Sequence, residues 1–123
     1  MLFFAPNVEA TPSEIKPEST QEMITRIAKS YGQDPELVLA IIKCEGEQYR
    51  TLGNNTNYDK QDRAWSTDIG LFQINDYYHA KTAEKMGIDI HTDRGNIVYA
   101  MWLMQKNGTR DWSASKQCWQ KLV

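Results

Sequence analysis

Two acidic residues stand out because their surroundings differ. Glu45 follows apolar residues at spacings of seven, four and three positions, so it continues the apolar face of a predicted helix. Those residues are Val38, Ile41 and Ile42. We therefore expect the Glu45 carboxyl to be partly desolvated. Asp68 lies among small and hydroxylated residues just before a glycine, where hydrogen bonds could keep it ionised near neutral pH. Two carboxyls in unlike environments indicate separate acid and base roles.

The element that must position Glu45 is a helix predicted to begin at Asp34-Pro35-Glu36. This start combines a capping carboxylate, a proline in the first turn and an acid near the positive end of the helix dipole. We expect the helix to run to about Arg50. Gly46 would then lie inside the helix and lower the helix stability by about 1 kcal/mol. Its missing side chain would leave room for another group to approach the backbone. The alternative is that Gly46 marks fraying toward the helix end.

The stretch after this helix, residues 51–64, is polar and rich in turn-forming residues, which predicts a loop or a small irregular hairpin. Together with the residues up to 75 it would form a small lobe. Trp65 would either plug this lobe against the core or line a cleft. The Asn and Asp residues lack the glycine and closing glutamate of a calcium-binding loop, so we expect neither a metal nor a cofactor.

Two further helices are predicted from start and stop signals. Ser19 or Thr20 can cap a helix that ends at Gly32. A polar and aromatic run leads into a short helix from His79 to Met86, which the following glycine stops. These segments place helices on both sides of the predicted lobe.

The remaining helices include the predicted centre of the fold. Thr92 can cap a helix from Asp93 to Asn107, and apolar residues cover nearly its whole circumference, which marks a buried central helix. A last short helix would carry Trp112 and Trp119. The predicted fold class is therefore mainly α, of the α+β kind, with a central buried helix and a small lobe at residues 51–75.

Length and composition predict one folded domain. The chain has 123 residues, 41% of them hydrophobic, and a net charge of −2. Residues 1–18 would form an extended leader, either the remnant of a secretion signal or a frayed tail, and residues 19–123 the domain. The charge leaves no basic field for nucleic acid, and no apolar run approaches the roughly 20 residues of a membrane span. We expect a monomer.

The two cysteines favour a disulfide. Cys44 follows Leu37, Ala40 and Ile41 at spacings of seven, four and three, so it faces inward, and Cys118 lies in the terminal helix. A bridge would pin the carboxy terminus to the helix that carries the first acid. The alternative of two buried thiols stays open, and a cysteine nucleophile is less favoured because no histidine lies close in sequence.

A specific motif links the sequence to a known superfamily. Residues 66–75 read Ser-Thr-Asp-Ile-Gly-Leu-Phe-Gln-Ile-Asn. This resembles the Ser-Thr-Asp-x-Gly-x-x-Gln-Ile-Asn signature of chicken-type lysozymes, and its Gly-Leu-Phe-Gln part is similar to the Gly-Leu-Met-Gln run of soluble lytic transglycosylases. Both belong to one lysozyme-like superfamily. The resemblance covers roughly residues 20–120 and implies an α+β lysozyme-like fold.

The resemblance implies roles for individual residues. Glu45 matches the catalytic acid and Asp68 the second carboxylate of chicken-type enzymes, which acts as stabiliser or nucleophile. Gln73 and Asn75 match cleft residues that contact the sugar backbone. We add two aromatic residues as candidate substrate-binding residues, Tyr78 and Trp112.

The chain also departs from both families. Chicken-type lysozymes carry four disulfides and are usually basic, whereas this chain can form one and is slightly acidic. Lytic transglycosylases usually show Glu-Ser-x-Phe at the acid, but here Glu45 is followed by Gly46 and Glu47. Glu47 is therefore a rival for the acid role. It aligns one helix turn after Lys43, which predicts that it faces solvent, so Glu45 is preferred.

The resemblance implies a peptidoglycan-cleaving glycosidase that acts on the β-1,4 bond between N-acetylmuramic acid and N-acetylglucosamine. Cleavage would proceed by hydrolysis or by intramolecular transglycosylation. Two carboxyls that flank the bond can divide the tasks of protonating the leaving oxygen and stabilising the oxocarbenium-like centre. The alternatives are a catalytically silent glycan-binding module and a structural or regulatory protein of the same fold. The expected ligand is peptidoglycan or a chitooligosaccharide-like glycan, and the expected location is secreted or cell envelope.

Overall fold

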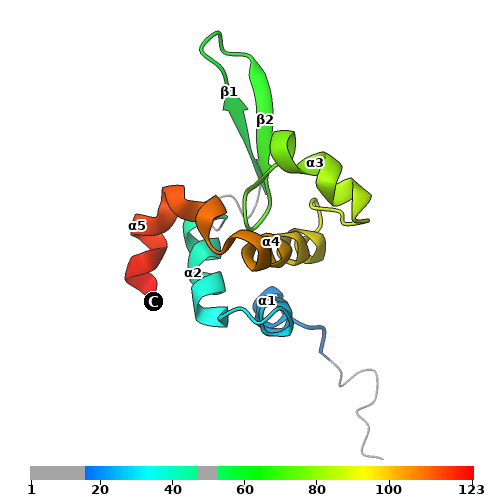
Figure 1. Ribbon diagram of the computed structural model, residues 1–123, viewed down its shortest axis with the longest axis vertical. Helices are drawn as coiled ribbons and strands as arrows, with labels where there is room; N and C mark the ends of the chain where they lie inside the picture. The colour runs from blue at the N-terminus through cyan, green and yellow to red at the C-terminus, as the bar shows by residue number, and fades with distance from the viewer. Residues whose placement is uncertain (1–15, 47–52) are drawn as a thin grey trace, which may run out of the picture.

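A computed structural model describes residues 16–46 and 53–123 of the chain (Figure 1). Residues 1–15 of the predicted leader lie outside this part, as does the rival acid Glu47. Helices and a small sheet make the fold α+β, which confirms the predicted class. In chain order the elements are α1 (Thr20–Ser30), α2 (Pro35–Glu45), β1 (Asn54–Tyr58), β2 (Ala64–Ile69), β3 (Ile74–Asn75), α3 (Asp76–Lys85), α4 (Asp93–Asn107), the 3-10 helix η2 (Arg110–Ser115), α5 (Lys116–Trp119) and the 3-10 helix η3 (Gln120–Leu122).

The first two helices begin at the predicted caps. Ser19 accepts a hydrogen bond from the Glu22 backbone N–H at 3.0 Å, and the Glu22 carboxylate accepts one from the Ser19 N–H at 3.0 Å, so α1 starts with a capping box. The Asp34 side chain accepts from the Glu36 N–H at 3.0 Å, with Pro35 in the first turn of α2. Local signals alone therefore place both helix starts.

The end of α2 differs from the prediction. The helix ends at Glu45, and Gly46 is its C-cap, whose N–H donates to the Ile42 carbonyl at 2.8 Å. Gly46 therefore does not lie inside the helix, and the remaining residues of the span predicted to reach Arg50 fall outside the described part. A Cβ on Gly46 would collide with the backbone of Leu71. The glycine thus permits the close backbone approach that the sequence suggested.

Helix α4 is the buried centre of the molecule, as predicted. Its fully buried side chains include Ile97, Tyr99 and Met101. The helix packs against α1 and η2, and α1 also packs against α2. Within the described residues, every helix is too short or too polar to cross a bilayer. One hydrophobic core therefore supports both the helices and the lobe.

The lobe is a three-stranded antiparallel sheet in the order β1-β2-β3, and its β1–β2 hairpin projects from the helical body (Figure 1). The pairing slips between Asn57 and Tyr58, so the hairpin alternative is confirmed, irregularity included. Strand β2 also pairs with β3, where Asp68 lies opposite Asn75. The register therefore brings two motif residues seven positions apart into contact across the strands.

Helix α3 begins three residues earlier than predicted. Its N-cap is Asn75, whose side-chain oxygen accepts from the Tyr78 N–H at 3.3 Å, and Asp76 occupies the first turn. An N-cap asparagine followed by an acid is a strong helix start, so the correction follows from capping chemistry. At the carboxy terminus, η2, α5 and η3 replace the single short helix that was predicted, with non-helical backbone angles at Trp112.

Candidate active site

A cleft of about 510 Å³ opens between the sheet lobe and the helices. It is lined by residues from α2, β2, the turn before β3, β3 itself, α3, α4 and η2. All six residues proposed from the sequence as catalytic or substrate-binding line it: Glu45, Asp68, Gln73, Asn75, Tyr78 and Trp112. Glu45 and Trp112 lie far along the chain from the other four, so only the folded protein brings all six together.

Glu45 is the last residue of α2 and is half-buried in this cleft. Loss of hydration on burial raises the pKa of its carboxyl above the ordinary glutamate value. The negative charge of Asp68 raises this pKa further, and a hydrogen bond with the Ser115 hydroxyl offsets part of the rise. Glu45 therefore keeps its proton to a higher pH than an exposed glutamate does, which is the property a general acid needs.

Asp68 is held by two asparagine side chains. The Asn57 amide donates to one carboxylate oxygen at 3.1 Å, and the Asn75 amide donates to the other at 2.9 Å. Each amide also donates to the Ser66 hydroxyl oxygen, at 3.0 Å in both cases. The expected hydrogen bonds to Asp68 are therefore present. They fix the direction of the carboxylate, because each of its oxygens accepts from a side chain on a neighbouring strand.

Asn75 has a holding role that the sequence did not reveal. Both of its amide N–H groups are used, one by Ser66 and one by Asp68, and its oxygen caps α3. These three bonds join the sheet, the second carboxylate and a helix start. The amide protons of Asn75 are thus already committed within the protein.

Gln73 lies in the turn that connects β2 to β3. Its φ of 51° places it in the left-handed region, which few residues other than glycine adopt. The Gln73 side-chain amide donates to the Gly70 carbonyl at 2.9 Å, and its backbone N–H donates to the same oxygen at 3.1 Å. These bonds hold the side chain along the cleft wall and compensate the unfavourable backbone angle.

The same turn is anchored by Asn96, which sequence reasoning missed. Asn96 is 1% exposed on the central helix. Its amide donates to the Ile69 carbonyl at 2.7 Å and to the Ile90 carbonyl at 2.9 Å, and its oxygen accepts from the Phe72 N–H at 2.9 Å. A polar residue on the fully apolar face of the predicted helix was the signal that could have identified it.

The aromatic candidates play different parts. Tyr78 is 66% exposed and meets Trp65 and Tyr77 edge to face, with ring centroids 6.4 and 5.1 Å apart. Trp65 is 45% exposed and is not among the residues that line this cleft, so it neither plugs the lobe against the core nor forms part of the cleft wall. Trp112 is 3% exposed, and its indole N–H donates to the Phe72 carbonyl at 2.9 Å. Trp112 is therefore a buried wall of the cleft, and Tyr78 is its exposed rim.

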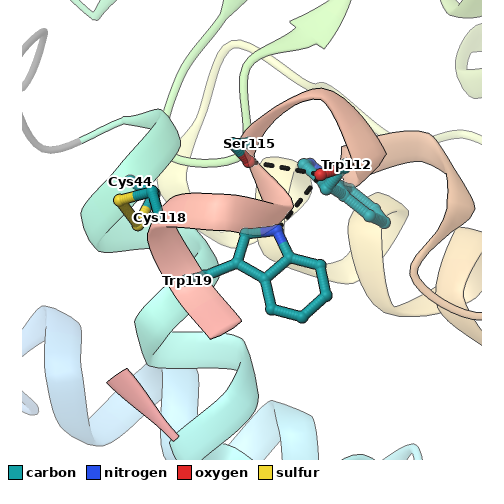
Figure 2. Close-up of a disulfide and its surroundings, with 5 residues drawn as sticks. All are labelled: Cys44, Trp112, Ser115, Cys118 and Trp119. Atoms are coloured by element: carbon teal, nitrogen blue, oxygen red, sulfur yellow. Dashed lines mark hydrogen bonds between the residues drawn. A yellow bond between two sulfur atoms is a disulfide. The ribbon is translucent and has the colours of Figure 1, made fainter. Parts of the chain in front are cut away.

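A disulfide joins Cys44 to Cys118, with an S–S distance of 2.04 Å and Cα atoms 6.0 Å apart (Figure 2). The favoured bridge is present, and the alternative of two buried thiols is wrong. In the same segment, Trp119 and Ser115 both donate to the Trp112 carbonyl, at 3.1 and 3.2 Å (Figure 2). Because Cys44 directly precedes Glu45, the bridge fixes this terminal segment beside the acid.

Two further polar residues of the cleft, His79 and Asp111, were not proposed as site residues from the sequence. Among the residues that the structure describes, no three His, Cys, Asp or Glu side chains lie close enough to hold a metal ion. The arrangement is thus one of three carboxyls (Glu45, Asp68 and Asp111), an imidazole, amides and aromatic rings around a cleft. A scan against models of protein families, a search of curated proteins and a search of solved structures each return no match.

Proposed function

We propose that the protein is a peptidoglycan-cleaving glycosidase that acts on the β-1,4 bond between N-acetylmuramic acid and N-acetylglucosamine. The observation that carries the proposal is the half-buried Glu45 carboxyl, whose pKa is raised by burial and by Asp68, in one cleft with that second carboxyl. Paired carboxyls on a cleft, one of them tuned to stay protonated, are typical of glycosidases.

The two carboxyls would divide the reaction. Glu45 protonates the leaving glycosidic oxygen, because its raised pKa keeps the proton available. Asp68, fixed by the amides of Asn57 and Asn75, stabilises or attacks the oxocarbenium-like carbon. The Ser115 hydroxyl can donate one hydrogen bond, and while Glu45 is protonated it donates this bond to the Trp112 carbonyl at 3.2 Å. Once Glu45 has lost its proton, the Ser115 hydroxyl can turn and donate to the Glu45 carboxylate instead.

The cleft chemistry fits an uncharged sugar chain. Amide and hydroxyl groups supply hydrogen bonds, and the exposed ring of Tyr78 supplies an apolar surface at the rim. With the motif at residues 66–75, these features support peptidoglycan or a chitooligosaccharide-like glycan as the ligand. The Cys44–Cys118 disulfide supports an oxidising location, secreted or in the cell envelope.

The test is cleavage of purified peptidoglycan, followed as loss of turbidity. Glu45→Gln is nearly isosteric, so we expect it to lower turnover by about 100-fold or more in a folded protein. Glu36→Gln is the matched control, because Glu36 is exposed at the other end of the same helix. Glu47→Gln tests the rival acid. Full activity of a folded Glu45→Gln protein would refute the assignment.

The same variant tests the pKa directly. A group whose pKa is raised by folding contributes stability below its unfolded pKa, and this contribution is lost as pH rises through the folded value. Glu45→Gln should therefore gain stability relative to the native protein as pH rises from the unfolded glutamate pKa of about 4.3 through the raised folded value. Activity that depends on protonated Glu45 should fall over the same pH range. Mass spectrometry of the products then distinguishes anhydro ends from reducing ends, and so transglycosylation from hydrolysis.

A catalytically silent glycan-binding module is the second candidate. The observation that favours it is the exposed aromatic group of Trp65, Tyr77 and Tyr78, which could hold sugar rings whether or not a bond is cut. Retention on insoluble peptidoglycan without release of fragments by the native protein would select this alternative. A native protein that is not retained on peptidoglycan and releases no fragments would have only a structural or regulatory role.

A further inference from the structure

His79 lines the cleft and has no part in the proposed division of labour between the two carboxyls. It lies in the first half of α3 and is half-buried. Its Nδ1 lies 2.9 Å from the hydroxyl oxygen of Tyr99, and the two rings meet edge to face with centroids 5.4 Å apart. One nitrogen of the imidazole is thus tied to the central helix.

The Tyr99 hydroxyl determines which nitrogen carries the imidazole proton. Tyr99 is fully buried, so its O–H needs an acceptor. Among the residues that the structure describes, His79 Nδ1 is the one hydrogen-bond partner of the Tyr99 hydroxyl. The Tyr99 O–H therefore donates to Nδ1, which must be unprotonated to accept. This bond leaves the imidazole proton on Nε2.

The Nε2 atom is accessible to solvent. Within residues 16–46 and 53–123, the structure pairs Nδ1 of His79 but gives Nε2 no partner. Every buried side-chain nitrogen and oxygen in that part of the chain has a hydrogen-bond partner, so an unpaired Nε2 must be reachable by solvent. Burial lowers the pKa of His79, and the negative charge of Asp111 opposes this shift only in part. The net lowering of the pKa keeps the ring neutral near pH 7.

We propose that His79 is a specificity-determining hydrogen-bond donor, whose Nε2–H binds an oxygen acceptor of the saccharide while Tyr99 holds its tautomer. A neutral imidazole with one fixed proton donates to a carbonyl or hydroxyl oxygen and does not select for charge, as an uncharged glycan requires. The saccharide part of this inference rests on the proposed function. The fixed tautomer does not, because it follows from contacts within the protein.

The tautomer is tested by NMR of ¹⁵N-labelled protein, in which protonated and bare imidazole nitrogens give distinct signals. The sequence contains two histidines, so the His91→Gln variant identifies the signals of His79. We expect a proton on Nε2 and a bare Nδ1 near pH 7. Tyr99→Phe, which keeps the ring but removes the hydroxyl, should populate both tautomers. A proton on Nδ1, or a mixture in the native protein, would overturn the inference.

The saccharide role is tested by adding chitotetraose or cellotetraose to the Glu45→Gln protein, in which cleavage is blocked. A shift of the His79 Nε2–H signal with chitotetraose alone identifies an acetamido carbonyl as the acceptor, and a shift with both identifies a hydroxyl. If Tyr78 signals move while those of His79 do not, the inference is wrong and the proposed function stands. If no cleft signal moves, both the saccharide role of His79 and the proposed function are wrong. The NMR spectrum of the native protein then still tests separately whether Nε2 carries the proton.

Binding affinity provides the matched measurement. His79→Phe keeps a ring in contact with Tyr99 but has no donor, and we expect it to weaken chitotetraose binding about three- to tenfold. His91→Phe alters the exposed histidine and should leave affinity unchanged. Equal affinities of the two folded variants would show that Nε2–H does not contact the sugar.

Discussion

Replacing Asn96 by aspartate tests how the turn between the two halves of the site is held. The native amide donates to the carbonyls of Ile69 and Ile90 and accepts from the Phe72 N–H. Aspartate keeps the acceptor for Phe72 but loses both donors, so an ionised oxygen would face two buried carbonyl oxygens. The change adds almost no volume, which confines the effect to hydrogen bonding and charge.

The magnitude follows from the two lost donors. Each buried carbonyl left without a partner costs about 1–3 kcal/mol, so Asn96→Asp should lower the free energy of unfolding by about 2–6 kcal/mol at pH 7. Protonating the carboxyl restores one donor and should recover about half of this loss. Folding thus raises the pKa of the new carboxyl above the unfolded value of about 3.9. The variant should be least impaired below that value and lose stability as pH rises.

The assay is urea unfolding at pH 4 and pH 7, followed by tryptophan fluorescence, because Trp112 and Trp119 are buried. Asn54→Asp on the exposed face of β1 is the matched control and should change the free energy of unfolding by less than about 0.5 kcal/mol. An equal loss for Asn96→Asp at both pH values, or a loss at pH 7 no larger than that of the control, would refute the reasoning.

Three further outcomes are expected. Replacing Cys44 and Cys118 together by alanine should lower the free energy of unfolding by about 4 kcal/mol, from the closed loop of 74 residues, and a loss under about 1 kcal/mol in urea would contradict this. Gly46→Ala should cost more than about 2 kcal/mol in the same assay, because the new Cβ meets the Leu71 backbone. Asp68→Asn should lower turnover by orders of magnitude with little change in glycan affinity; a loss below tenfold would leave Glu45 as the sole catalytic carboxyl.

The local parts of the fold were predictable from the sequence. Asp34-Pro35 and Thr92 start α2 and α4 as predicted, because caps depend on residues within one helical turn. Apolar residues around the whole circumference of α4 predicted its central position, because this pattern also depends only on residues within one helix. Helical spacing also placed Glu45 on a partly desolvated face. Each of these features follows from a period or a cap that neighbouring residues specify.

The register and the partners needed the tertiary structure. The pairing of Asp68 with Asn75 depends on how β2 meets β3, and it gives Asn75, a predicted sugar contact, the further role of supporting the second carboxylate. Asn96 reaches Phe72 across 24 positions, and His79 reaches Tyr99 across 20. A periodic pattern shows which face of an element is apolar, but it does not state which distant group that face will meet. Such contacts form only when separate elements pack against one another. The tertiary structure therefore determined which groups meet in the cleft.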